Sequence, residues 1–123
     1  MSPTTLSWVK QLFESIDSKD TDSFLSFLSE DVCFRFGNSE PALGKVAVSE
    51  IVSNFFNSIM GLKHDLAKIW DVQESLICHG TVTYTRLDST QISVPFANVL
   101  RFEGTLVSEY LIFVDISELY GKV

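Results

Sequence analysis

The hydrophobic pattern of this 123-residue chain changes its period at Gly61, and this change constrains the fold more than any other feature. Before Gly61, apolar residues recur every three or four positions, which is typical of amphipathic helices. After it, apolar and polar residues alternate, which is typical of half-buried strands. The alternating stretches cover residues 62–72, 76–87, 91–102 and 105–116. Because the connections between them suit hairpins, the sequence predicts an α+β domain in which helices precede an antiparallel meander.

Three helices are predicted in the first half of the chain. Ser2 and Pro3 form a helix start, a capping hydroxyl followed by the residue favoured at the first helical position. Asp20 or Thr21 caps the second helix, and Gly61 ends the third. The pattern places the helical faces over residues 6–16, 24–28 and 48–59, and a short first strand over residues 32–36.

Long strands in so small a domain must curl, because sheets twist and bulge. With the helices on its concave side, such a sheet forms a cone-shaped α+β barrel that encloses a cavity. Pro95 falls inside a predicted strand, which implies a bulge or an unpaired stretch there. His79 precedes Gly80 and is itself a candidate bulge residue. The length of the chain fits one domain, residues 1–123.

Composition and charge narrow the possible partners. A hydrophobic fraction of 46% excludes general disorder. Nucleic acids and anionic membranes are bound by clustered Lys and Arg, whereas this chain scatters 9 basic residues among 16 acidic ones and carries a net charge of -7. We therefore expect neither partner. No apolar run is long enough for a membrane span, and the start lacks the pattern of a secretory signal.

The two cysteines bear on the cellular compartment. Cys33 and Cys78 both lie in apolar surroundings and could be paired. Without a signal peptide, the sequence favours the other interpretation, in which both are reduced core thiols of a cytoplasmic protein.

A resemblance to a known family rests on five segments of the chain, residues 12–17, 34–37, 41–45, 82–86 and 113–117. The order of elements is similar to that of the nuclear transport factor 2-like superfamily, and more closely to its SnoaL-like polyketide cyclase and ketosteroid isomerase branch. This resemblance implies the cone-shaped fold and a small-molecule pocket, but not one reaction, because the fold hosts isomerases, cyclases, dehydratases, epoxide hydrolases and binding proteins.

The ketosteroid isomerase resemblance implies one retained site residue. The catalytic base of those enzymes, an Asp at the end of the first strand, falls on Arg35 or Phe34 here, and the oxyanion-hole tyrosine falls near Leu12. The second oxyanion residue falls on Asn98. An asparagine keeps a hydrogen-bond donor there without needing a shifted pKa.

The resemblance to the limonene-epoxide hydrolase branch implies a second retained site residue. Its Arg-x-Asp pair falls on Thr81 and Thr83 and is lost, whereas its other aspartate matches Asp115. If Asp115 faces the cavity among apolar groups, burial should raise its pKa into the range of a general acid or base.

Strand parity turns these positions into a predicted pocket, because alternate side chains share one face of a sheet. If Asn98 and Asp115 point inward, the cavity also receives His64 from the first long strand. The remaining predicted lining residues are Trp8, Leu12, Phe34, Phe55, Trp70, Thr81, Thr83, Phe96, Glu109 and Phe113. The outer face would carry Val82, Tyr84, Val99 and Arg101, a stripe that predicts a homodimer.

The sequence supports two functional hypotheses. In the first, a homodimer binds a small, largely apolar organic molecule and performs cofactor-free acid–base chemistry on a carbonyl compound: isomerisation, cyclisation or dehydration. Asp115 would be the base or acid, His64 its proton partner and Asn98 the donor to a developing oxyanion. In the second, the protein is a non-catalytic ligand-binding or structural dimer. No metal or cofactor is expected, because two histidines without a nearby ligand cluster make a weak metal site.

Overall fold

A computed structural model describes residues 3–120 and confirms the predicted order of three helices, a first strand and four long strands. It differs in adding a two-residue strand, Ala42–Leu43, and in ending the third helix at Asn57 rather than at Gly61. The second helix is shorter than predicted and the first strand begins at Leu28, while the predicted cap residue Ser2 lies outside the described residues. Within residues 3–120, no helix is both long and apolar enough to cross a membrane. The elements are α1 (Pro3–Asp17), α2 (Thr21–Leu25), β1 (Leu28–Phe36), β2 (Ala42–Leu43), α3 (Lys45–Asn57), β3 (Gly61–Val72), β4 (Ser75–Thr85), β5 (Gln91–Glu103) and β6 (Leu106–Val114).

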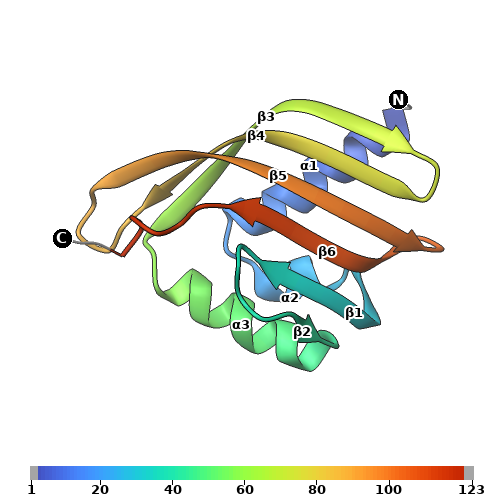
Figure 1. Ribbon diagram of the computed structural model, residues 1–123, viewed down its shortest axis with the longest axis horizontal. Helices are drawn as coiled ribbons and strands as arrows, with labels where there is room; N and C mark the ends of the chain where they lie inside the picture. Colours follow the sequence, from blue (N-terminus) through green and yellow to red (C-terminus); the bar gives the residue numbers. More distant parts are fainter. Residues whose placement is uncertain (1–2, 121–123) are drawn as a thin grey trace.

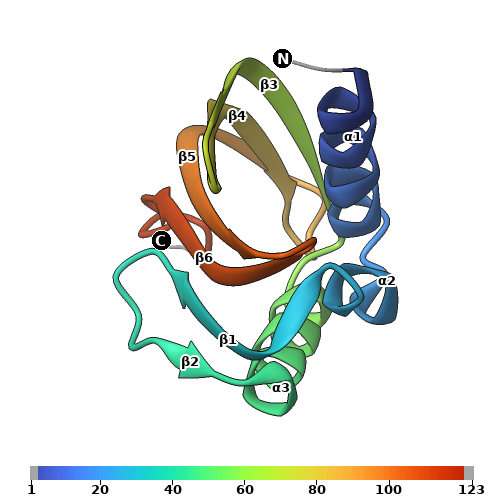
Figure 2. The same ribbon diagram turned by 90° about the vertical axis from the view of Figure 1, so that its right-hand side faces the viewer.

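The strands form one curved sheet in the order β2-β1-β6-β5-β4-β3 (Figure 1). The predicted antiparallel meander from β3 to β6 is confirmed. The sequence did not predict that β1 joins β6 in parallel, with Phe34 opposite Tyr110. Figure 2 shows the sheet bending around the three helices, as expected for the cone-shaped fold. The sheet is not closed into a barrel, because β2 and β3 remain its two edges.

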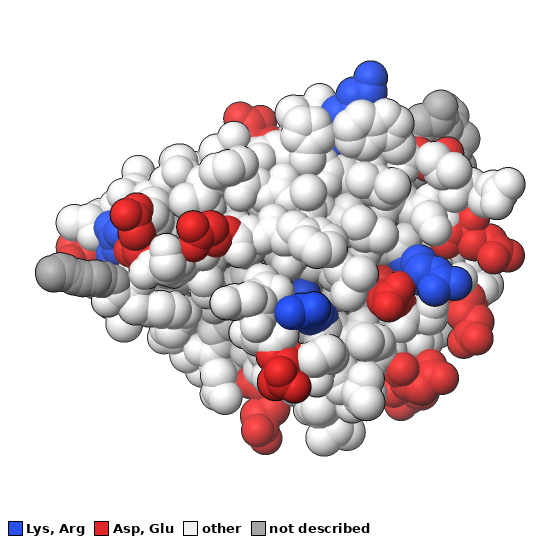
Figure 3. All heavy atoms as spheres, viewed as in Figure 1, with Lys and Arg blue, Asp and Glu red and all other residues white. Residues whose placement is uncertain are grey.

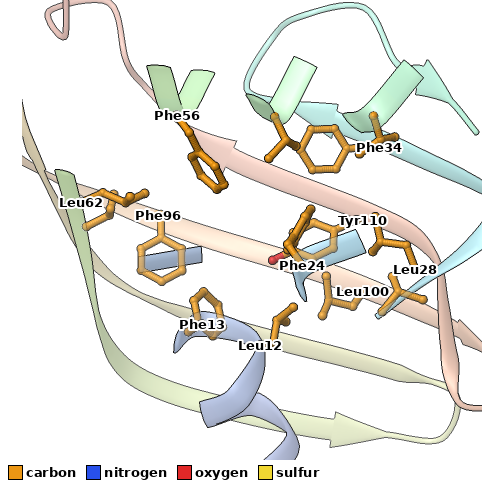
Figure 4. Packing of buried hydrophobic residues seen from close by; sticks show 14 of the residues in the cluster. Leu12, Phe13, Phe24, Leu28, Phe34, Phe56, Leu62, Phe96, Leu100 and Tyr110 are labelled. Carbon is orange, nitrogen blue, oxygen red and sulfur yellow. The ribbon is translucent and has the colours of Figure 1, made fainter. Parts of the chain in front are cut away.

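The helices fill the concave side of the sheet with apolar side chains. The cap predicted for α2 is confirmed: the Asp20 carboxylate accepts a hydrogen bond of 3.1 Å from the Ser23 backbone N–H. Gly44 precedes α3 at a φ of 89°, a conformation that glycine adopts without strain. Figure 4 shows how the core combines residues of the helices with inward residues of the sheet, among them Leu12, Phe13, Phe24, Phe56, Phe96 and Leu100.

A bulge next to Gly80 divides β3 into two halves. Leu66 pairs with Gly80 and Lys68 with His79, so the extra residue is Ala67 rather than the predicted His79. Beyond the bulge the inward and outward positions of β3 exchange. For that reason the expected inward orientation of Trp70 is wrong. Trp70 pairs with Ile77, stacks on His79 with ring centroids 5.6 Å apart and is 41% exposed on the outer face.

Pro95 sits in regular register opposite Thr81, so no bulge occurs there. The other predicted explanation, an unpaired stretch, is confirmed on one side. Pairing of β5 with β6 begins only at Phe96, opposite Val114, and Pro95 has no β6 residue beside it. A strand position without a neighbour tolerates the missing backbone donor of proline.

Both cysteines are free thiols, Cys33 half-buried and Cys78 fully buried. This agrees with the prediction of reduced thiols and not with a pair. Burial raises the pKa of the Cys78 thiol to about 12, so it stays protonated and unreactive in the folded protein.

The close approach at the bulge yields a first prediction. A Cβ atom at Gly80 would lie 2.0 Å from the Asp65 carbonyl oxygen, which is backbone and cannot move aside. We expect Gly80→Ala to lower the free energy of unfolding by about 3 kcal/mol or more, at the upper end of the usual cost of overpacking. Gly61→Ala is the matched control, because nothing lies within 4 Å of its Cβ position. Urea unfolding of both variants measures the difference, and equal stability would contradict the proposed constraint.

Candidate functional site

An apolar cavity lies between the concave face of the sheet and helices α1, α2 and α3. Its volume is about 50 Å³. The inner wall is buried, whereas Ile51 on α3 is 40% exposed, which places the open side of the cavity at α3. The lining residues are Ile16, Phe24, Phe34, Phe36, Ile51, Val52, Phe55, Phe56, Leu62, His64, Val82, Tyr84, Phe96, Asn98, Tyr110 and Ile112.

A carboxylate fixes the one histidine in this cavity. Asp17 ends α1, and its Oδ2 accepts a 3.0 Å hydrogen bond from the His64 backbone N–H. Its Oδ1 lies 2.6 Å from His64 Nδ1. The imidazole ring is further held between Phe13 and Phe96, at centroid distances of 4.9 and 5.0 Å. With Nδ1–H donated to Asp17, a neutral imidazole presents Nε2 as an acceptor that can take up a proton.

Two polar groups in the same cavity lack partners. Neither Asn98 Oδ1 nor the Tyr110 hydroxyl has a hydrogen-bond partner within residues 3–120, and both atoms are buried. Asn98 on β5 lies opposite Ile112, and Tyr110 on β6 lies opposite Leu100, so the two are diagonal neighbours on the inward face. Figure 4 shows the Tyr110 side chain among core aromatic rings, with its oxygen pointing to the interior.

The environment keeps the Tyr110 hydroxyl protonated. Burial raises the pKa of Tyr110 well above its ordinary value, and the nearby Cys78 and Asp17 raise it further because a second negative charge would be repelled. Tyr110 is therefore a neutral group that can donate a hydrogen bond. An unpaired buried group of this kind is costly, and native proteins keep few of them.

The structure brings five of the predicted site residues together. His64, Asn98, Phe34, Phe55 and Phe96 all line the cavity. The two α1 residues of the prediction do not. Leu12 is fully buried but is not a lining residue, and Trp8 packs edge-on against Phe27 and Phe102.

The predicted parity of β4 and β6 is wrong. Asn98 pairs with Cys78 and Ile112, and cross-strand partners share a face of the sheet. The alternate set of side chains on β4 and β6 therefore faces outward. This set contains Thr81, Thr83, Glu109 and Phe113, which were predicted to face inward. Val82 and Tyr84 were predicted to lie on the outer face, but both are buried. Val99 and Arg101 lie on the outer face, as expected.

Asp115 also lies outside the cavity. It follows β6, is exposed, and accepts a 2.9 Å hydrogen bond from the Ser117 backbone N–H. The backbone and side-chain hydrogen bonds of Ser117 lower the pKa of Asp115, so the expected rise is wrong. A carboxylate in such a turn stays ionised and satisfied by its own neighbours.

Sequence reasoning missed Asp17 and Tyr110. In the sequence, Asp17 is part of the run that ends the first helical pattern. It lies four positions after Phe13, however, and residues four apart share one face of a helix, so Asp17 lies on the buried face of α1. Tyr110 alternates with Ile112 and Val114, a more apolar set than the one that contains Asp115. Choosing the apolar set of that strand would have turned Tyr110 inward.

The unpartnered hydroxyl of Tyr110 yields a second prediction. We expect Tyr110→Phe to leave the free energy of unfolding unchanged or to raise it by about 1 kcal/mol, because an unpaired buried hydroxyl carries a desolvation cost. Urea unfolding at neutral pH measures the effect. Tyr120→Phe is the control, since its hydroxyl lies 2.8 Å from Ser58 Oγ and its loss should not stabilise the fold. A loss above about 1 kcal/mol in Tyr110→Phe would show that its hydroxyl is paired in solution.

Comparison with known proteins places this geometry in a family. No curated protein matches the sequence significantly. An NTF2-like protein of unknown function from Burkholderia pseudomallei has a similar structure, with a TM-score of 0.84, 18% identity, and coverage of 97% of this chain and 95% of that one. A protein with a ketosteroid isomerase-like fold from Catenulispora acidiphila, solved with trimethylamine, gives a TM-score of 0.81 at 13% identity, covering 89% and 85%. The structure of TerC, co-crystallised with polyporic acid, has a TM-score of 0.79 and 14% identity, with coverage of 94% of each chain.

At such low identities these structures establish a shared fold and no shared activity. The sequence itself supplies the finer assignment, because the model of the SnoaL-like domain matches residues 9–110. This protein belongs to the SnoaL-like domain family and has the NTF2-like fold.

Proposed function

We propose that the cavity performs acid–base chemistry on a small, largely apolar carbonyl compound, as an isomerisation, cyclisation or dehydration. One observation carries the proposal: His64, oriented by Asp17, faces an apolar cavity that also holds the unpartnered polar groups of Asn98 and Tyr110. An oriented base beside convergent polar groups in an apolar pocket is the usual composition of a small-molecule site.

Each polar residue then has a role in proton transfer. His64 Nε2 takes a proton from the carbon next to the substrate carbonyl, and Asp17 stabilises the imidazolium that forms. The electron pair of the broken C–H bond moves to the carbonyl oxygen. Tyr110, neutral because of its raised pKa, donates a hydrogen bond to that developing oxyanion, and the Nδ2–H group of the Asn98 amide donates a second one, because the Oδ1 atom can only accept. The roles first expected of Asp115 pass to His64 and Asp17.

The size of the cavity limits how a substrate enters. A dry engineered cavity that binds benzene measures about 150 Å³, whereas this cavity measures about 50 Å³. A substrate with a ring must therefore displace side chains. Ile51 and Phe55 of α3 are the partly exposed lining residues best placed to move.

The same small volume favours a second candidate function. A cavity with room for only a few water molecules is also compatible with a well-filled core. In that case the protein is a non-catalytic binding or structural member of the family. The two candidates differ in whether any carbonyl compound exchanges hydrogen in the presence of the protein.

Hydrogen exchange tests the proposal directly. All three proposed reactions begin with removal of a proton next to a carbonyl group. We therefore expect the protein in D₂O to accelerate deuterium incorporation into at least one apolar ketone of a broad panel, followed by proton NMR. His64→Gln should reduce the rate at least about 100-fold, the lower end of a general-base contribution. Asp17→Asn should reduce it less, because it removes only the orientation of the ring.

The second histidine provides the matched control. His79 stacks on Trp70 on the outer face, far from the described chemistry, so His79→Gln should retain the full exchange rate. Equal rates in the wild type and His64→Gln would contradict the proposed base. Ligand-induced thermal stabilisation without any exchange would favour the non-catalytic candidate.

We further propose that the protein is a homodimer formed through the outer face of the sheet. Figure 3 shows a broad band of uncharged atoms across this face, with charged side chains mostly along its margins. Val99 lies opposite Leu111, and Phe113 is 54% exposed. Arg101 and Glu109 lie 3.8 Å apart beside this stripe and offer both signs of charge to a symmetry-related copy. Such a stripe is costly to leave in water.

Light scattering at micromolar concentration tests the dimer. We expect twice the monomer mass for the wild type and the monomer mass for Phe113→Glu, because a carboxylate in the apolar stripe opposes burial. Val46→Glu is the control, since Val46 is 88% exposed on α3, a helix on the concave side of the sheet, opposite the apolar stripe. A monomeric wild type would refute the proposal.

We also propose a reducing, cytoplasm-like setting. The free thiols of Cys33 and Cys78 support it, because proteins of oxidising compartments commonly pair their cysteines.

A further inference from the structure

The two unpartnered groups of the cavity have different hydrogen-bonding capacities. Asn98 Oδ1 is an amide oxygen and can only accept a hydrogen bond. The Tyr110 hydroxyl can donate as well as accept, and its raised pKa keeps its proton in place. As diagonal neighbours on β5 and β6 they approach the same part of the inner wall. A ligand that pairs with both atoms must offer a donor to Asn98 Oδ1, and it can offer either an acceptor or a donor to the Tyr110 hydroxyl.

A single neutral hydroxyl group can pair with both atoms. A hydroxyl group donates its hydrogen to Asn98 Oδ1 while its oxygen accepts from Tyr110, with each bond near 2.8 Å. A carbonyl or ether oxygen can only accept, and it leaves Asn98 Oδ1 unpaired. An anionic ligand is disfavoured, because no Lys or Arg is among the lining residues and a buried charge needs a partner.

The surroundings of this pair favour a planar ring. The ring of Tyr110 contacts Phe24 edge-on at 5.4 Å and tilts against Phe34 at 5.7 Å. Phe96, two residues before Asn98 on the same face of β5, lies edge-on to His64 at 5.0 Å. Aromatic walls attract another ring through edge-to-face and offset contacts beyond simple area burial.

We propose that Asn98 and Tyr110 form a subsite that recognises the hydroxyl group of a neutral, planar ring compound, a phenol or a stable enol. The inference rests on the proposed function only in taking the cavity as the ligand site. It goes further by naming the group that the inner wall selects. A ring of the same size without any oxygen leaves both polar atoms unpaired, and one with an ether oxygen leaves Asn98 Oδ1 unpaired, so a site built in this way discriminates against both analogues.

Three probes of similar size test the subsite: phenol, toluene, which lacks the oxygen, and anisole, which only accepts. Their affinities for the full chain are measured by ligand-observed NMR titration. We expect phenol to bind at least about tenfold more tightly than toluene or anisole, a preference of the size that one hydrogen-bonded group provides. Tyr110→Phe and Asn98→Leu should each reduce this preference severalfold while toluene binding persists. Tyr120→Phe, which removes a hydroxyl outside the cavity, should keep the wild-type preference.

The outcomes separate this inference from the proposed function. Equal affinities for the three probes, an unchanged preference in Tyr110→Phe, or no binding of any probe would overturn the subsite. Tyr110→Phe keeps the test decisive if Asn98→Leu does not fold. A phenol preference that both variants abolish supports the subsite even if no ketone exchanges hydrogen in D₂O. Exchange that depends on His64 without any phenol preference supports the acid–base function and overturns the subsite.

Discussion

The close approach of the β3 and β4 backbones at Gly80 sets which side chains of β3 face the helices and which face outward. No side chain fits there, because a Cβ atom would lie 2.0 Å from the Asp65 carbonyl oxygen. The approach accompanies the bulge at Ala67, and bulges bend and twist the strand that carries them. One half of β3 consequently turns His64 toward the end of α1. The other half turns Trp70 to the outer face.

The Asp17–His64 contact joins the helical layer to the edge strand of the sheet. It ties α1 to β3 through both carboxylate oxygens, and Phe13 of the same helix packs on the histidine ring. A helix end thus fixes the side chain that we propose as the base. The Asn98 and Tyr110 groups are fixed on central strands, where the ladder holds their backbones rigidly. Sites built on regular elements keep their geometry better than sites on loops.

The buried polar groups oppose the stability of an otherwise apolar core. Asn98 and Tyr110 stand among aromatic and aliphatic side chains, and apolar residues there would fold with less desolvation cost. Local departures from the best-packed sequence are expected where a protein binds or reacts with something. The family alone does not identify a reaction, because one fold hosts many activities.

The sequence by itself determined the order of helices and strands, the hairpin connections and the family. These depend on local periodicity and turn residues, as the cap at Asp20 and the strands from β3 to β6 illustrate. It also placed His64 and Asn98 correctly. Only the tertiary structure decided which alternate set of side chains on β4 and β6 faces inward. The inward residues are Val82, Tyr84 and Tyr110, and not Thr81, Thr83 and Asp115 as predicted. It also brought Asp17 to His64 across 47 residues. The physical reason is that alternation along a strand fixes two faces but not their direction, which register and bulges between strands set over long distances.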